Sequence, residues 1–333
     1  MSDKILKLLS LVIIICLYAC KTETTQKEEV SVPEKVVSVP DFNADSAYHF
    51  VKKQVDFGPR VPGTEAHAEA AAYFVSKLES YGAEVQVQAF DVTTFDNQQV
   101  TLKNIIASFD PEKTKRVLLA AHWDSRPFAD KDTVRQFEAI AGANDGASGV
   151  GVLLEVARVI SKYEGPDVGV DIIFFDGEDW GNDTAYQDEV PLRGDWETWW
   201  CLGSQYWSKN KHKPRYSAYY GILLDMVGAK GSQFHMEGYS LNFAATIVDK
   251  VWGRAANLGY GNIFVRNKQP GITDDHVFVN KDAKIPMINI VHYDPEHGYF
   301  GDYHHTHRDN MDLISTETLD AVGETILHVI YYE

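Results

Sequence analysis

Four apolar segments, separated by stretches with helical periodicity, constrain the fold of this chain more than any other feature. Such segments are typical of strands buried on both faces, and helices between them favour a parallel sheet covered on both sides. The strands are expected at residues 116–122, 170–176, 218–226 and 286–292, with two more at 85–90 and 102–109. The helices are expected at 64–81, 146–160, 239–258 and 315–331. The sequence therefore predicts a single α/β domain with a mixed, mostly parallel central sheet flanked by helices.

Acidic and imidazole side chains follow the predicted strands where a parallel sheet would gather them. His122 ends one strand, the sequence Asp-Gly-Glu-Asp at 176–179 ends the next, and Asp225 lies near the end of a third. Asp145 directly precedes a glycine-rich helix start. Because ligands of open α/β sheets bind beyond the carboxyl ends of the strands, we expect these side chains to converge.

Any metal bound by this chain must be held by histidine and carboxylate. The three cysteines, at positions 16, 20 and 201, cannot form a Cys-rich zinc site. Six of the twelve histidines fall between residues 276 and 307. Three of these six lie in the segment His304-His305-Thr306-His307. This donor set suits Zn²⁺ in a catalytic site with three protein ligands.

Most of these residues also have a structural explanation. Asp145 is a suitable helix cap, Glu178 and Asp179 could form a solvated loop, and the histidine segment could be a surface tract. Asp225 is the hardest to explain in this way, because an acid inside an apolar strand must be paired or bound to a ligand. Cys201 is expected to pack rather than react.

Residues 1–19 have the features of a lipoprotein signal peptide. A basic start precedes an apolar run from Leu8 to Leu17, which is too short to span a bilayer as a mature helix. The following Tyr-Ala-Cys resembles a bacterial lipobox, in which Cys20 would become the lipidated first residue. An ordinary secretory signal peptide is the alternative. A lipidated Cys20 predicts a cell-envelope protein facing the periplasm, tethered to either the inner or the outer membrane.

The rest of the chain divides into a tether and a domain. Residues 20–40 are polar and charged, which predicts a flexible tether, and residues 41–333 form the predicted catalytic domain. Acidic residues outnumber basic ones 48 to 31, for a net charge of -17. This balance argues against a nucleic-acid partner, because phosphate binding needs clustered Lys and Arg.

The order of motifs resembles a known superfamily. From about residue 42 to the C-terminus, HWDS, GANDGASG, FFDGED, LLDMVG, DDH and HTHRDN resemble the zinc-dependent aminopeptidase-like proteins of peptidase family M28. Within it, the chain looks most like the glutaminyl cyclases, especially bacterial lipoprotein versions. Asp274-Asp275 before His276 and the Asp309-Asn310 ending favour this subgroup, as do the tryptophans that follow FFDGED. These are Trp180, Trp196, Trp199, Trp200 and Trp207.

The resemblance implies a metal site with one zinc ion. Its ligands would be Asp145, Asp179 and His305, the last because the spacing to Asp309-Asn310 fits. Animal cyclases have Glu where this chain has Asp179. His122 matches a position that binds a second zinc in the peptidases, whereas the cyclases lack that metal.

The resemblance also implies the reaction. Glutaminyl-peptide cyclotransferases convert the N-terminal glutamine of peptides and proteins to pyroglutamate and release ammonia. Glu178 would be the general acid and base, and Asp225 and Asp274 would form an acidic network beside the substrate amide. Because the α-amine and the γ-carboxamide belong to one residue, ring closure is intramolecular and much of its entropic cost is already met.

Three questions stay open at this stage. His304 stands where animal cyclases have Trp, so Trp196, Trp199 and Trp200 are candidates for the missing pocket wall, beside the matching aromatic Phe300. A di-zinc aminopeptidase of the same fold is an alternative function. A catalytically inactive lipoprotein that binds peptide or glycan is another.

Overall fold

The computed structural model describes residues 37–182, 192, 194 and 196–333. The predicted signal peptide, Cys20 and most of the predicted tether lie outside the described residues. Residues 37–333 belong to one compact unit. Among the described residues, no helix is both long enough and apolar enough to cross a membrane.

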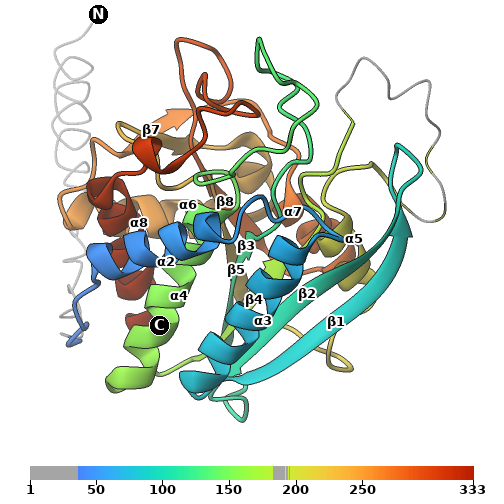
Figure 1. Ribbon diagram of the computed structural model, residues 1–333. Helices are drawn as coiled ribbons and strands as arrows, with labels where there is room; N and C mark the ends of the chain where they lie inside the picture. Colours follow the sequence, from blue (N-terminus) through green and yellow to red (C-terminus); the bar gives the residue numbers. More distant parts are fainter. Residues whose placement is uncertain (1–36, 183–191, 193, 195) are drawn as a thin grey trace, which may run out of the picture. The chain divides into compact units, whose positions relative to one another are not determined.

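A six-stranded sheet forms the centre of this unit (Figure 1). Its strands, in spatial order, are β1 (Glu84–Thr93), β2 (Gln99–Phe109), β4 (Gly169–Phe175), β3 (Arg116–His122), β5 (Tyr220–Asp225) and β8 (Met287–Val291). The four strands β4, β3, β5 and β8 run parallel, while β2 pairs antiparallel with both β1 and β4. The predicted mixed, mostly parallel sheet is therefore confirmed.

Helices cover both faces of the sheet, and the side chains of its central strands divide between two cores. On β3, Val117 and Leu119 join the larger core, whereas Leu118 and Ala120 join a second core with Trp207. Successive side chains of a strand point to opposite faces, so a strand covered on both faces is apolar throughout. This explains why the central strands appear in the sequence as continuous apolar runs.

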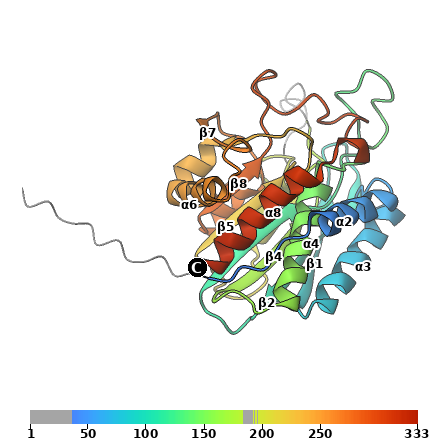
Figure 2. The ribbon, with the colours of Figure 1, turned by 90° about the vertical axis from the view of Figure 1, so that its left-hand side faces the viewer.

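The larger core is covered by five helices, which are labelled in Figure 2. They are α2 (Ala44–Asp56), α3 (Glu65–Ser80), α4 (Ala147–Lys162), α6 (Gly238–Asn257) and α8 (Thr316–Tyr331). The second core is covered by α5 (Leu202–Lys209) and by α7 (Asp275–Phe278) with the π-helical turn Val279–Ala283. A small parallel pair, β6 (Phe234–Met236) and β7 (Phe264–Lys268), and a 3₁₀ turn at Met311–Leu313 complete the described elements.

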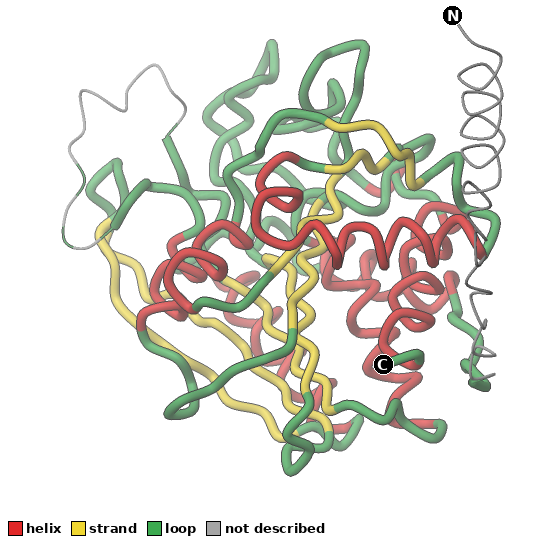
Figure 3. Tube along the Cα trace, turned by 180° about the vertical axis from the view of Figure 1, so that it is seen from behind, coloured by secondary structure: helices red, strands yellow, loops and turns green. Residues whose placement is uncertain are grey.

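Long loops gather on one side of the molecule, at the top of the view from behind (Figure 3). The loops that follow β3, β4, β5 and β8 carry the polar motifs singled out in the sequence. The polar side chains of these motifs therefore lie at the carboxyl ends of the parallel strands, where they were expected to converge.

Candidate metal and catalytic site

A cavity of about 570 Å³ lies at the carboxyl ends of the parallel strands. Five of the six predicted site residues line it, namely Asp145, Glu178, Asp225, Asp274 and His305. The sixth, Asp179, does not line the cavity; it is 1% exposed and contacts His305, which does. The structure thus brings together, from four different loops and the end of β5, all the residues that the motifs pointed to.

The three predicted zinc ligands face one another. His305 Nε2 lies 3.1 Å from Asp179 Oδ1 and 3.8 Å from Asp145 Oδ2. Two ligands that each bind zinc at about 2 Å in a tetrahedral site are about 3.3 Å apart, so these separations suit a shared ion. His305 adopts a left-handed backbone conformation with φ 58°, which is uncommon for a residue other than glycine and typical of functional sites.

Asp179 gives the clearest indication that a ligand is needed. Among the described residues, neither of its carboxylate oxygens accepts a hydrogen bond, although the side chain is buried. Burial raises the pKa of Asp179 well above its usual value, and the nearby Asp145 carboxylate raises it further. Buried carboxylates without hydrogen bonds are costly, and a bound cation would remove that cost.

Two buried aspartates hold the ligand loops in place, a feature that the sequence analysis did not predict. Asp124 accepts hydrogen bonds from the backbone N–H groups of Glu178 and Asp179, both at 3.1 Å. Asp309 accepts in the same way from Asn144 at 2.6 Å and Asp145 at 2.9 Å. Each of these two pairs of hydrogen bonds, here called a clamp, joins one ligand loop to another segment of the chain. The relative positions of the ligands therefore depend on both clamps.

Replacing Asp309 by Ala should lower the free energy of unfolding by about 2–5 kcal/mol, because two buried N–H groups lose their acceptor. Urea unfolding of the variant and the wild-type protein would measure this change. Asp302→Ala is a suitable control, because Asp302 is exposed and its side chain pairs with Arg308 on the surface. Equal unfolding midpoints for the two variants would contradict the role of Asp309.

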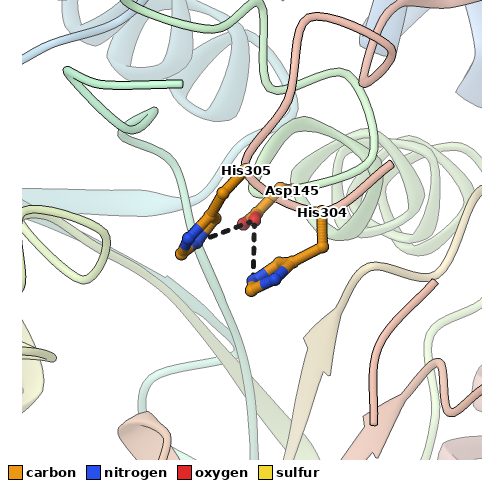
Figure 4. Close-up of side chains that lie close together, drawn as sticks. All are labelled: Asp145, His304 and His305. Atoms are coloured by element: carbon orange, nitrogen blue, oxygen red, sulfur yellow. Dashed lines mark ion pairs between the residues drawn. The ribbon is translucent and has the colours of Figure 1, made fainter. Parts of the chain in front are cut away.

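A second imidazole, that of His304, lies beside Asp145, although only its neighbour His305 was predicted to be a ligand. Figure 4 shows His304 and His305 both directed at the Asp145 carboxylate, and His304 Nε2 lies 3.8 Å from Asp145 Oδ2. The two imidazole rings stack with their centres 3.6 Å apart. Burial and the neighbouring Lys131 lower the pKa of His304 to about 3, so the neutral ring accepts a hydrogen bond from the Lys131 ammonium at 2.8 Å.

His122 lies between two carboxylates of the cavity. Its Nε2 is 3.0 Å from Asp145 Oδ1 and 3.3 Å from Asp225 Oδ1. Burial opposes its protonation, but hydrogen bonds with Asp124, Asp145 and Asp225 outweigh burial and raise its pKa well above the usual value. The same three side chains, His122, Asp145 and Asp225, form a group that could hold a metal ion. The residues for a second metal are therefore present.

Several carboxyl groups of the cavity lie close enough together to shift one another's pKa. Burial raises the pKa of Asp225 to about 7, against the hydrogen bond from His122. Burial likewise raises the pKa of Glu178 well above its usual value, and Asp274 adds to this rise. Close carboxylates of this kind share protons, so the cavity can both accept and donate a proton near neutral pH.

Asp274 is held from two sides. Its Oδ2 accepts a hydrogen bond from the Asn289 side chain at 2.6 Å. Glu237, at the start of α6, accepts one from the backbone of Ile272 at 2.7 Å and contacts His276 Nε2 at 3.1 Å. Asn289 and Glu237 therefore fix the segment that carries Asp274, and neither was predicted to act at the site.

Trp200 forms the aromatic wall that the sequence analysis left open among three tryptophans. It lines the cavity, and its ring stacks on His305 with the ring centres 5.7 Å apart. Phe300 also lines the cavity. Trp196 instead packs against Phe90, and Trp199 is 3% exposed.

Comparison with known families gives the class of this protein. The model of peptidase family M28 matches residues 104–330, and the chain therefore belongs to this family. The family predicted from the motifs is confirmed.

Two solved structures and one further relative show which members of the family this chain is similar to. The glutaminyl cyclase of Bacteroides thetaiotaomicron, crystallised with N-acetylhistamine, is 49% identical with a TM-score of 0.84, covering 89% of this chain and 100% of that one. A Zn-dependent exopeptidase from Parabacteroides distasonis is 50% identical with a TM-score of 0.83, covering 88% of this chain and 99% of that one. The Bacillus subtilis aminopeptidase YwaD is 27% identical over 71% of this chain, which spans only 45% of that protein.

Proposed function

We propose that this protein is a zinc-dependent glutaminyl cyclase, which converts the N-terminal glutamine of peptides and proteins to pyroglutamate and releases ammonia. The observation that carries the proposal is its likeness to the Bacteroides thetaiotaomicron glutaminyl cyclase, at 49% identity over the full length of that chain. The acid-lined cavity with an aromatic wall supports it. Asp145, Asp179 and His305 are the proposed ligands of a single zinc ion, which when bound would supply a Lewis acid for the γ-carbonyl group.

The side chains of the cavity fit the proton transfers of this reaction. The neutral α-amine forms the new C–N bond to the carbonyl carbon of the side-chain carboxamide (Cδ of glutamine), and Glu178 accepts the proton that the amine nitrogen must lose. Glu178 then donates a proton to the leaving amide nitrogen, the old C–N bond breaks, and ammonia departs. Proton and charge are therefore balanced without any other reactant.

The remaining cavity residues position the substrate. Asp225 and Asp274, which line the cavity beside Glu178, are suited to hold the amide nitrogen of the substrate. Trp200 and Phe300 give an apolar wall that limits access of water, which would otherwise favour hydrolysis. The cavity, at about 570 Å³, has room for the glutamine and part of the following residue.

A two-zinc aminopeptidase is the second candidate function. His122, Asp145 and Asp225 could hold the second metal that peptide hydrolysis commonly uses. The Parabacteroides distasonis and Bacillus subtilis proteins compared above are named as peptidases. An assay with a Gln-peptide and with Leu-anilide, each with and without chelator, separates the candidates. A cyclase releases ammonia from the Gln-peptide alone and stops on chelation, whereas release of aniline product would favour the peptidase.

We also propose that Cys20 is lipidated and tethers the domain to an envelope membrane on its periplasmic side, as the lipobox-like sequence at the N-terminus suggests. The expected result is incorporation of labelled fatty acid into the wild-type protein in cells and its loss in Cys20→Ser. Equal labelling of the two proteins, or none of either, would contradict a lipidated Cys20.

A further inference from the structure

The thiol of Cys201 lies against the carboxylate proposed to be the general acid and base. Cys201 is fully buried at the start of α5, and its Sγ is 3.2 Å from Glu178 Oε1. The two segments are also joined by backbone hydrogen bonds, from Cys201 N–H to the Glu178 carbonyl and from Leu202 N–H to the Gly177 carbonyl, both at 3.0 Å. Cys201 is thereby held beside Glu178 through both backbone and side chain.

The surroundings of Cys201 favour the neutral thiol. Burial raises its pKa well above the usual value, and the nearby carboxylates of Glu178 and Asp275 raise it further. A neutral thiol beside a carboxylate oxygen donates a hydrogen bond to it. One oxygen of Glu178 is then engaged, which leaves the other for the proton that moves in the reaction. Cys201 also belongs, with Glu178 and Asp274, to a group of side chains that could hold a metal ion, so the zinc content of Cys201 variants has to be measured with their activity.

We propose that Cys201 is a positioning residue, whose S–H group donates a hydrogen bond to Glu178 Oε1 and fixes the orientation of that carboxylate in the cavity. The proposal rests on the catalytic role proposed for Glu178. A long carboxylate side chain has several rotamers, and a donor that selects one keeps the acting oxygen within reach of the substrate amine. Holding a base in this way affects turnover more than substrate binding.

Replacing Cys201 by Ala and by Ser tests the hydrogen bond. Cys201 has a left-handed backbone conformation with φ 58°, and Ala and Ser carry the same Cβ, so the two variants share its backbone strain. Cys201→Ala should lower kcat about tenfold with little change in KM, because a hydrogen bond to a charged group is lost. Cys201→Ser, which keeps a donor, should restore kcat to within about threefold of wild type. The zinc content should be that of the wild-type protein in both variants.

Ser208→Ala is the matched control on the same helix. Ser208 is 4% exposed, and within the described part of the chain its hydroxyl has no hydrogen-bond partner, so its removal should leave kcat unchanged. Wild-type kcat in Cys201→Ala would overturn the proposal. Equal loss in the Ala and Ser variants would indicate a reactive thiol instead, and loss of zinc would indicate a metal ligand.

An infrared measurement tests the contact without reference to turnover. The difference spectrum between the full-length wild-type protein and Cys201→Ala isolates the S–H stretching band of Cys201, which moves to lower frequency when the thiol donates a hydrogen bond. The band should move to higher frequency in Glu178→Gln, because a neutral amide is a weaker acceptor than a carboxylate. An unchanged band would overturn the contact. Failure of the wild-type protein to cyclise Gln-peptides would instead overturn the proposed function and leave this readout intact.

Discussion

Replacing Glu178 by Gln should lower the rate of cyclisation by roughly 10²–10⁴, the range that a positioned general acid and base contributes. The amide has nearly the shape of the carboxylate, so the cavity and the metal site should be preserved. It cannot accept the proton from the attacking amine, and it cannot return one to the leaving ammonia. Steady-state rates with a Gln-peptide, measured alongside zinc content, would show whether the loss is chemical.

A control variant separates this effect from a general loss of negative charge. Glu138 is exposed and pairs with Arg135 at 3.4 Å, so Glu138→Gln removes one carboxylate without entering the cavity. It should cyclise the peptide at the wild-type rate. If Glu178→Gln did so as well, Glu178 could not be the group that transfers the proton.

Replacing Asp179 by Ala should remove zinc and activity together. With one of the three proposed ligands gone, the affinity for zinc should fall by more than about 100-fold, beyond the effect expected of a residue that only supports a ligand. Elemental analysis after dialysis against a weak chelator would measure the retained zinc, and the cyclisation rate would be measured on the same samples.

His304→Ala is the matched variant for this comparison. His304 Nε2 and His305 Nε2 lie at the same distance of 3.8 Å from Asp145 Oδ2, but the His304 ring is also hydrogen-bonded to Lys131. The proposed ligand set predicts that His304→Ala keeps its zinc. Loss of zinc from His304→Ala, with zinc retained in Asp179→Ala, would instead make His304 the third ligand.

The sequence predicted the sheet well because its central strands are buried on both faces. The predicted strands 116–122, 170–176 and 286–292 lie within one residue of β3, β4 and β8 at each end. The hairpin strands β1 and β2 are longer than expected. Their outer ends pair only with each other and alternate exposed residues, such as Asp91 and Thr101, with more buried ones, such as Val92. Each added end is only three residues long, which is too short for this alternation to predict a strand by itself.

Two helices of eight or more residues, α2 and α5, were not predicted, for different reasons. The helix α2 buries Ala47, Phe50, Val51 and Gln54, which is a helical spacing that the sequence does contain. The helix α5 is only eight residues long and starts from Cys201 in a left-handed conformation, without a capping side chain. The first could have been found from its periodicity, whereas the second depends on the tertiary contacts of Cys201 with Glu178.

The residues of the candidate site also fall into two groups, those whose positions the sequence predicts and those whose positions it does not. Residues placed by the ends of strands, such as Asp225, follow from the topology of the sheet, because parallel strands end at one edge. His304, Trp200 and the clamp formed by Asp124 depend on loop conformations and side-chain rotamers. No local pattern in the sequence specifies those conformations, so the structure was needed to place these residues.

The proposed function requires a single zinc ion bound jointly by Asp145, Asp179 and His305. Anomalous diffraction at the zinc absorption edge, from crystals of the zinc-loaded protein, tests it most directly. One peak is expected, within about 2 Å of an atom from each of the three side chains. A second peak between Asp145 and Asp225, or a single peak away from Asp179, would contradict it.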